Sequence, residues 1–278
     1  MYQALSPDCI GHAVPFSRAA AVIAKYGFEG VWFELTHEDT ADAEPVLELL
    51  ARYRLRAAGF GLPVDFRRDG AVFEADLKNL EKYARYAGKI GIDRCITWML
   101  PGSDTLTYAE NFKLHRERLG EAAKVLKEYG IRLGLEFVGT PSMRRQFRYE
   151  FIHDLGQTLE LCDAVGTGNV GLLMDAWHWQ MAGQTQEDFK KIPDESWVVL
   201  AHIMDAPAGL TVGQQQDTVR RLPGSTGVLK IADFFRGLRD LAYTGPVVPE
   251  PFEPKLGEMP FEEAVKTTKE AVDRVWPQ

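Results

Sequence analysis

Short apolar runs alternate along this chain with longer stretches whose apolar residues recur at helical spacing. The run from Val170 to Met174 is continuous and ends in Asp175, which is typical of a strand buried on both faces of a parallel sheet. Phe73 to Lys89 instead carries apolar side chains three or four positions apart, which indicates a helix that buries one face. On this basis strands are predicted at residues 4–10, 30–35, 56–62, 94–100, 132–138, 170–175, 197–203 and 246–252. Helices are predicted at residues 15–26, 45–53, 73–89, 111–129, 151–165, 231–242 and 261–276.

The joints between these elements repeat one another. Segments 25–28, 89–92 and 128–131 each place a charged residue, Tyr or Ile, then Gly and an apolar residue where a helix gives way to a strand. Eight strands alternating with helices, without a linker between them, predict an α/β fold with a single (β/α)8 TIM barrel over residues 1–278. A long loop around residues 205–230 is expected to cover the site. A doubly wound sheet is the less favoured alternative, because no Gly-x-Gly-x-x-Gly motif follows the first strand and eight strands would make a wide open sheet.

Composition narrows the classes of partner. The chain has 45% hydrophobic and 26% charged residues, which is ordinary for a globular protein, and its net charge of -8 would repel a nucleic-acid backbone. Cys9, Cys95 and Cys162 are far apart, without the spacing of a zinc knuckle or redox pair, so a reducing cytoplasm is expected. No run of 18 uncharged apolar residues and no basic, then apolar, leader is present, so neither a membrane span nor export is predicted.

Four predicted strands in the second half of the chain end in a residue that can bind a metal ion, namely Glu136, Asp175, His202 and Glu250. Alone, each has an ordinary explanation as a helix cap, an ion-pair partner or a core histidine. In a barrel, however, the four strand ends converge on one axis, where the carboxylates would repel each other without a cation between them. The sequence therefore predicts one divalent metal ion. Oxygen-rich ligands favour Mn²⁺ or Mg²⁺, while Co²⁺ or Zn²⁺ also suits the set.

These strand ends, Gly-Leu-Glu136-Phe, Met-Asp175-Ala-Trp-His178, His202-Ile-Met-Asp205 and Pro-Glu250-Pro-Phe, resemble those of the xylose-isomerase-like sugar isomerase/epimerase superfamily. That superfamily includes ketose 3-epimerases, inosose dehydratases and hydroxypyruvate isomerases. The resemblance implies that Glu136, Asp175, His202 and Glu250 hold the metal ion. It also implies that His178 contacts a substrate oxygen, that Glu136 and Glu250 are the catalytic carboxylates across the substrate, and that the protein is a homo-oligomer, a dimer or tetramer.

The chemistry expected of such a site is isomerisation or epimerisation of a small keto-sugar or keto-polyol. A base abstracts the proton next to a metal-bound carbonyl, and an enediolate follows. Two alternatives share the ligand set or the fold. One is a lyase or dehydratase acting on a keto-sugar, keto-glycoside or inosose, and the other is a non-catalytic sugar-binding or accessory subunit. Endonuclease IV, a distant relative, is disfavoured because the third and fourth strands end without histidine.

The substrate contacts of ketose 3-epimerases are not all present. Those proteins carry an Arg six residues after the metal His and a Glu six residues after the first metal Glu, where this chain has Ala208 and Ser142. Basic residues are available instead at 144, 145 and 148 and at 220 and 221, and Arg145 and Arg221 are taken as candidate substrate ligands.

Three further residues are candidate contacts. Trp98 and Trp177 lie at predicted strand ends, where an aromatic ring could form a wall against a sugar. His12 follows the first predicted strand and could also face the site.

Overall fold

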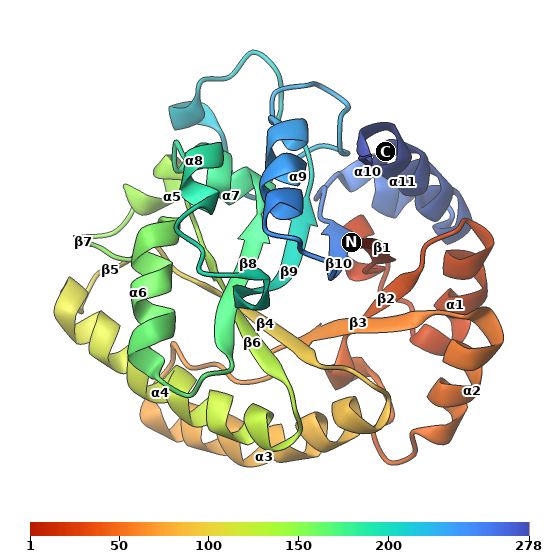
Figure 1. Cartoon of the computed structure of the whole chain (residues 1–278), viewed down its shortest axis with the longest axis horizontal. Coiled ribbons are helices and arrows are strands. Elements are labelled where there is room, and N and C mark those ends of the chain that lie inside the picture. Colours follow the sequence, from red (N-terminus) through yellow and green to blue (C-terminus); the bar gives the residue numbers. More distant parts are fainter. Residues whose placement is uncertain (278) are drawn as a thin grey trace.

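Eight parallel strands close into a barrel in the computed structural model, which describes residues 1–277 (Figure 1). Around the barrel the strands follow the order β1-β10-β9-β8-β6-β4-β3-β2. The prediction of a (β/α)8 barrel is therefore confirmed. The barrel strands are β1 (Tyr2–Leu5), β2 (Gly30–Phe33), β3 (Arg56–Gly61), β4 (Arg94–Met99), β6 (Arg132–Phe137), β8 (Val170–Asp175), β9 (Val198–Ile203) and β10 (Pro246–Pro249).

Helices surround the barrel (Figure 1). The apolar residues at helical spacing in the sequence pack these helices against the barrel. The larger helices are α1 (Phe16–Lys25), α2 (Glu44–Tyr53), α3 (Gly70–Lys89), α4 (Tyr108–Glu128), α6 (Leu155–Val165), α9 (Ile231–Asp240) and α11 (Phe261–Val275). Short helices and a small antiparallel pair decorate the loops: α5 (Pro141–Arg144), α7 (Ala176–Met181), α8 (Gln186–Phe189), α10 (Pro254–Glu258), β5 (Gly102–Ser103) and β7 (Tyr149–Glu150). None of the helices in residues 1–277 is both long and apolar enough to cross a membrane.

The inward direction of the candidate ligands follows from the two-residue period of a strand. Leu173, Leu200 and Val248 belong to the small apolar cluster that also contains Tyr2 and Ala4, apart from the larger cluster that lies mostly between strands and helices. Two residues after each of the first three come Asp175, His202 and Glu250, so these polar side chains lie on the same, inner side of the barrel. The barrel thus changes from apolar filling to polar groups at the carboxyl ends of its strands.

Several predicted boundaries were wrong. The first strand ends at Leu5, and Asp8–Ile10 forms a turn of 3-10 helix. The predicted strand at 246–252 ends at Pro249, so Glu250 lies just beyond it. Directly after β8 comes the short helix α7, which the sequence analysis missed; Asp175 caps it by accepting a hydrogen bond from the His178 backbone.

The segment between β9 and α9 leaves the barrel and returns to it, and it forms the extended loops at the top of Figure 1. Its base is fixed by two reciprocal backbone hydrogen bonds between Asp205 and Arg221. The fully buried Asp205 carboxylate also accepts hydrogen bonds from the backbone of Thr226, Gly227 and Leu229. Both ends of the excursion are thereby held against the barrel.

Candidate metal and substrate site

Four side chains from β6, β8, β9 and the residue after β10 meet at the carboxyl end of the barrel. Glu136, Asp175, His202 and Glu250 each offer one ligand atom, and these atoms all lie within 4.8 Å of one another. His202 Nδ1 is 3.8 Å from a Glu136 oxygen, 3.8 Å from an Asp175 oxygen and 3.6 Å from a Glu250 oxygen. The structure thus brings together the four residues that the sequence analysis named as metal ligands.

The chemistry of this donor set fits a divalent cation. Glu136 Oε1 and His202 Nδ1 are buried and have no hydrogen-bond partner among residues 1–277. Burial, followed by the nearby charges of Asp175 and Glu250, raises the pKa of Glu136 well above its usual value. A cation bound between these groups would give both unpartnered atoms a partner and would offset the repulsion between the carboxylates.

Arg220 also reaches this centre, although it lies on the long segment after β9. The guanidinium is buried, and its Nη1 donates hydrogen bonds to Asp175 Oδ2 at 3.0 Å and Glu250 Oε2 at 2.6 Å. Its Cζ lies 5.4 Å from the centroid of the Trp177 ring and 4.9 Å from the centroid of the Phe252 ring. Burial alone would raise the pKa of Glu250, but His202 and Arg220 reverse that effect and lower it. Arg220 is thus a fixed positive charge at the centre of the site.

Sequence reasoning selected the neighbour Arg221 and missed the role of Arg220. Arg221 points elsewhere: it lies 3.6 Å from Glu253 and donates to the Arg220 carbonyl. The ketose 3-epimerase pattern predicts an arginine six residues after His202, where this chain has Ala208. The antiparallel pairing of Asp205 with Arg221 instead returns a residue much farther along the chain to the centre.

His178 lies beside Arg220 as the third residue of α7, and its imidazole is buried. Its Nε2 is 3.1 Å from Arg220 Nη2 and 3.4 Å from Asp217 Oδ1. Its Nδ1 faces the backbone N–H of Gly139 at 3.3 Å. Burial, the largest influence on this ring, lowers the pKa of His178. The predicted substrate contact therefore belongs to the same polar cluster as the four candidate ligands.

The two candidate wall tryptophans have different surroundings. Trp98 is 41% exposed and pairs in register with Glu136, so its ring lies on the inner side at the mouth of the barrel. Arg67 stacks on this ring at 4.3 Å and donates to the Trp98 carbonyl. Trp177 is instead fully buried, and its indole N–H donates to Thr140. A buried indole does not line an open mouth, and the Trp177 ring instead lies 5.4 Å from the Arg220 guanidinium.

The remaining candidates hold loops in place. Arg145 donates to the carbonyl of Gly213, and Ser142, at the position where epimerases carry Glu, donates to the carbonyl of Gln215. Both residues thereby fasten the long segment after β9 to the loop after β6. His12 hydrogen-bonds through Nε2 to the Leu256 carbonyl and packs edge-on against Phe261. These contacts give Arg145 and His12 structural partners away from the centre.

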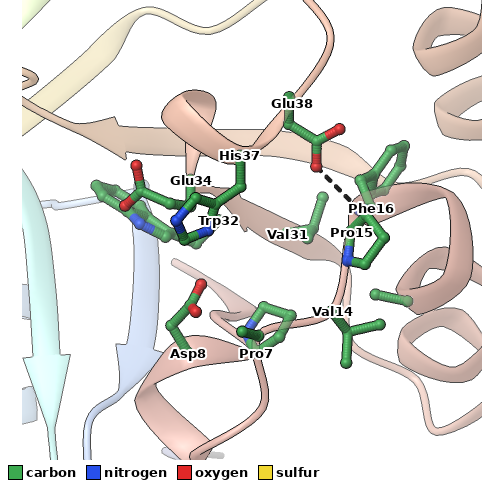
Figure 2. Close-up of a pocket in the computed structure, with 12 residues that line it drawn as sticks. Pro7, Asp8, Val14, Pro15, Phe16, Val31, Trp32, Glu34, His37 and Glu38 are labelled. Atoms are coloured by element: carbon green, nitrogen blue, oxygen red, sulfur yellow. Dashed lines mark hydrogen bonds between the residues drawn. The ribbon is translucent and has the colours of Figure 1, made fainter.

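A crevice of about 370 Å³ lies between the loops that follow β1 and β2. Figure 2 shows the Asp8 carboxylate pointing across it toward Glu34 and His37, with Val31 at the back. Burial and the Glu34 charge raise the pKa of Asp8. Cys9, which follows the lining residue Asp8 in the sequence, has its thiol 4.0 Å from Glu250 Oε1. The carboxylates of the crevice would disfavour an anionic group on this side of the mouth.

Comparison with known proteins points in one direction. A family model described as "Xylose isomerase-like TIM barrel" matches residues 20–275. The inosose isomerase of Halalkalibacterium halodurans is 32% identical over 157 residues, which cover 56% of this chain and 52% of that protein. The chain thus spans about half the length of the curated relatives it matches.

Solved structures resemble the chain over nearly its full length. A xylose isomerase domain protein from Alicyclobacillus acidocaldarius has a TM-score of 0.86 at 25% identity, covering 99% of this chain and 98% of that one. The IolI protein with a bound zinc atom has a TM-score of 0.84 at 20% identity, with coverage of 99% and 98%. At this identity the second likeness shows the fold alone.

Proposed function

Because the chain belongs to the xylose isomerase-like TIM barrel family, we propose that it is a divalent-metal-dependent isomerase or epimerase of a small keto-sugar or keto-polyol. The observation that carries the proposal is the convergence of Glu136, Asp175, His202 and Glu250 at the carboxyl end of the barrel. Mn²⁺ is the metal that best suits three carboxylates and one imidazole, and Zn²⁺ is the next candidate, since a solved structure of this fold holds zinc.

The residues of this chain can divide the reaction among them. Glu136 and Glu250 come from strands separated by β8 and β9 in the barrel, so they approach the centre from different sides. We infer that one of them removes the proton beside the substrate carbonyl and the other returns a proton to complete the reaction. A divalent cation held by Glu136, Asp175, His202 and Glu250 would supply Lewis-acid polarisation of the carbonyl. The Arg220 guanidinium adds a fixed positive charge where negative charge develops on the substrate oxygen.

The surroundings favour an uncharged substrate. Arg145 and Arg221, the arginines considered as anion ligands, are bonded to loop carbonyls or paired with Glu253. Arg220 is already surrounded by carboxylates, and the crevice between the loops after β1 and β2 carries Asp8 and Glu34. The curated relatives are named inosose isomerases, which is consistent with an uncharged keto-polyol. An inosose is therefore the first substrate to test, followed by free ketoses.

The test is proton exchange in D₂O, followed by NMR, with metal-loaded protein and a panel of inososes, ketoses and keto-glycosides. Deuterium incorporated beside the carbonyl, with every oxygen of the substrate retained, supports an isomerase or epimerase. A product that has lost water or an aglycone would transfer the assignment to a lyase. The absence of exchange with every substrate, despite bound metal, would contradict enzymatic function and favour a binding subunit.

Two variants test which groups carry out the proton transfer. Glu136→Gln and Glu250→Gln should each lower the rate of product formation by at least about 100-fold, because an amide can neither accept a proton from carbon nor return one. Glu253→Gln is the matched control, since Glu253 follows the same strand but pairs with Arg221 outside the centre. Unchanged product formation in both site variants would overturn the assigned roles.

A further inference from the structure

The imidazole of His178 is enclosed by two groups that only donate hydrogen bonds. The backbone N–H of Gly139 faces Nδ1 at 3.3 Å, and Arg220 Nη2 faces Nε2 at 3.1 Å. A protonated ring could accept from neither, so this arrangement calls for a neutral ring. A neutral ring has one free lone pair in its plane, and therefore only one of the two donors can be satisfied.

The carboxylate of Asp217 can accept a hydrogen bond from this ring, because its Oδ1 lies 3.4 Å from Nε2. With the proton on Nε2, the ring accepts from Gly139 and donates to Asp217. With the proton on Nδ1, that N–H would point at the Gly139 N–H and lack an acceptor in a fully buried position. The first tautomer therefore satisfies more of the buried polar groups.

The same carboxylate holds Arg220. Nη2 donates to Asp217 Oδ1 at 2.6 Å, and Nε donates to the Asp217 carbonyl at 2.9 Å. These two bonds turn the other end of the guanidinium, Nη1, toward Asp175 and Glu250. Without the Asp217 carboxylate, Nη2 would compete for the lone pair of Nε2 and favour the other tautomer of His178.

We propose that Asp217 is a positioning residue, which fixes the Nε2–H tautomer of His178 and turns Nη1 of Arg220 toward Asp175 and Glu250. The expected effect on turnover rests on the proposed function, whereas the tautomer of His178 and the orientation of Arg220 do not. One residue of the long segment after β9 thus fixes the hydrogen-bonding directions of two side chains, His178 from α7 and Arg220 from the segment itself.

The tautomer can be measured without any turnover. In Zn²⁺-saturated protein with ¹⁵N-labelled histidine, we expect a pyrrole-type nitrogen at Nε2 of His178 and a pyridine-type nitrogen at Nδ1. The signals are assigned by their loss in His178→Gln. Asp217→Asn should move Nε2 toward the pyridine type, because the amide can donate to it where the carboxylate only accepted. A pyridine-type Nε2 in the unsubstituted protein, or no change in Asp217→Asn, would overturn the proposal.

Kinetics provide a second, independent readout. Asp217→Asn should lower kcat by about 10- to 100-fold, the usual effect of removing a group that orients site residues, while KM changes less. Asp217→Glu should restore part of the loss. Glu253→Gln is the matched control, because both carboxylates are similarly exposed, at 18% and 17%, and each pairs with one of the adjacent arginines 220 and 221. Equal kcat values for Asp217→Asn and the control would refute the positioning role.

The two proposals fail in different ways. If the unsubstituted protein exchanges no deuterium with any substrate but shows the Nε2–H tautomer, the proposed function falls and the assignment of Asp217 stands. If exchange is observed but His178 has the other tautomer, the enzyme remains and the positioning role is wrong.

Discussion

Acidification should destabilise this protein through His115, a residue of α4 that lies away from the candidate site. Its imidazole is buried against Phe66 and Phe151, with ring centroids at 5.2 and 4.7 Å. Nδ1 donates to the Asn111 carbonyl at 2.9 Å, while Nε2 has no partner among residues 1–277. Burial lowers the pKa of His115 to about 4 from an ordinary value of 6.5. The native state therefore holds this ring in its neutral form.

The size and sign of the effect follow from proton linkage. Between pH 6.5 and about pH 4 the unfolded chain binds a proton at His115 and the native state does not, so the free energy of unfolding falls as the pH falls. Over this window the loss should reach about 3 kcal/mol, at roughly 1.4 kcal/mol for each unit of pKa difference. Above pH 6.5 both states are neutral at this position, and the stability owed to His115 is complete.

The assay is urea unfolding at several pH values between 7 and 4, with His115→Phe as the perturbation. Phenylalanine does not titrate, so the free energy of unfolding should fall less steeply for the variant, and the difference between the two proteins should change by about 3 kcal/mol across the window. His37→Gln is the control, because it removes a histidine that is exposed. A difference between protein and variant that stays constant from pH 7 to pH 4 would refute the reasoning.

Other substitutions test the metal site, the packing of the barrel and its mouth. His202→Ala should reduce the metal bound per chain, measured by elemental analysis after dialysis, because it removes the only nitrogen among the four candidate ligands. Gly171→Ala should lower stability by about 1–3 kcal/mol in thermal unfolding, since its methyl group would lie 2.3 Å from the Trp197 carbonyl, whereas Gly61→Ala meets no atom within 4 Å and should not. Trp98→Ala should raise KM with little change in kcat if the exposed ring is a wall for substrate, and an unchanged KM would exclude that role.

The parts of this structure that repeat could be predicted from the sequence. Apolar runs marked the strands because a parallel strand is covered on both faces, and β8 begins and ends where its run does. The strand ends then pointed to the candidate ligands, since side chains alternate and Asp175, His202 and Glu250 each follow an inward apolar residue by two positions. Local pattern and barrel closure were sufficient for these residues.

The parts that depend on tertiary contacts could not be predicted in this way. Trp177 comes soon after the end of β8, but the chain turns at once into α7 and buries the ring next to Arg220. Arg220 has no local signal that separates it from Arg221, since both are basic residues in the same irregular segment. Only the pairing of Asp205 with Arg221 decides which guanidinium enters the barrel and which pairs with Glu253.

That pairing also makes the position of Arg220 independent of the length of the loop between Asp205 and Arg221. Because Asp205 and Arg221 are bonded to each other, Arg220 stays at the centre whatever the number of residues at the loop tip, where Leu210 and Val212 are exposed. Lengthening a flexible loop has a small entropic cost, about 0.6 kcal/mol for each doubling. Insertions and deletions at the tip can therefore present new side chains above an unchanged arrangement of Arg220 and the candidate ligands. This segment is where evolution, or an engineer, could change the surface above the barrel mouth while leaving the candidate site as it is.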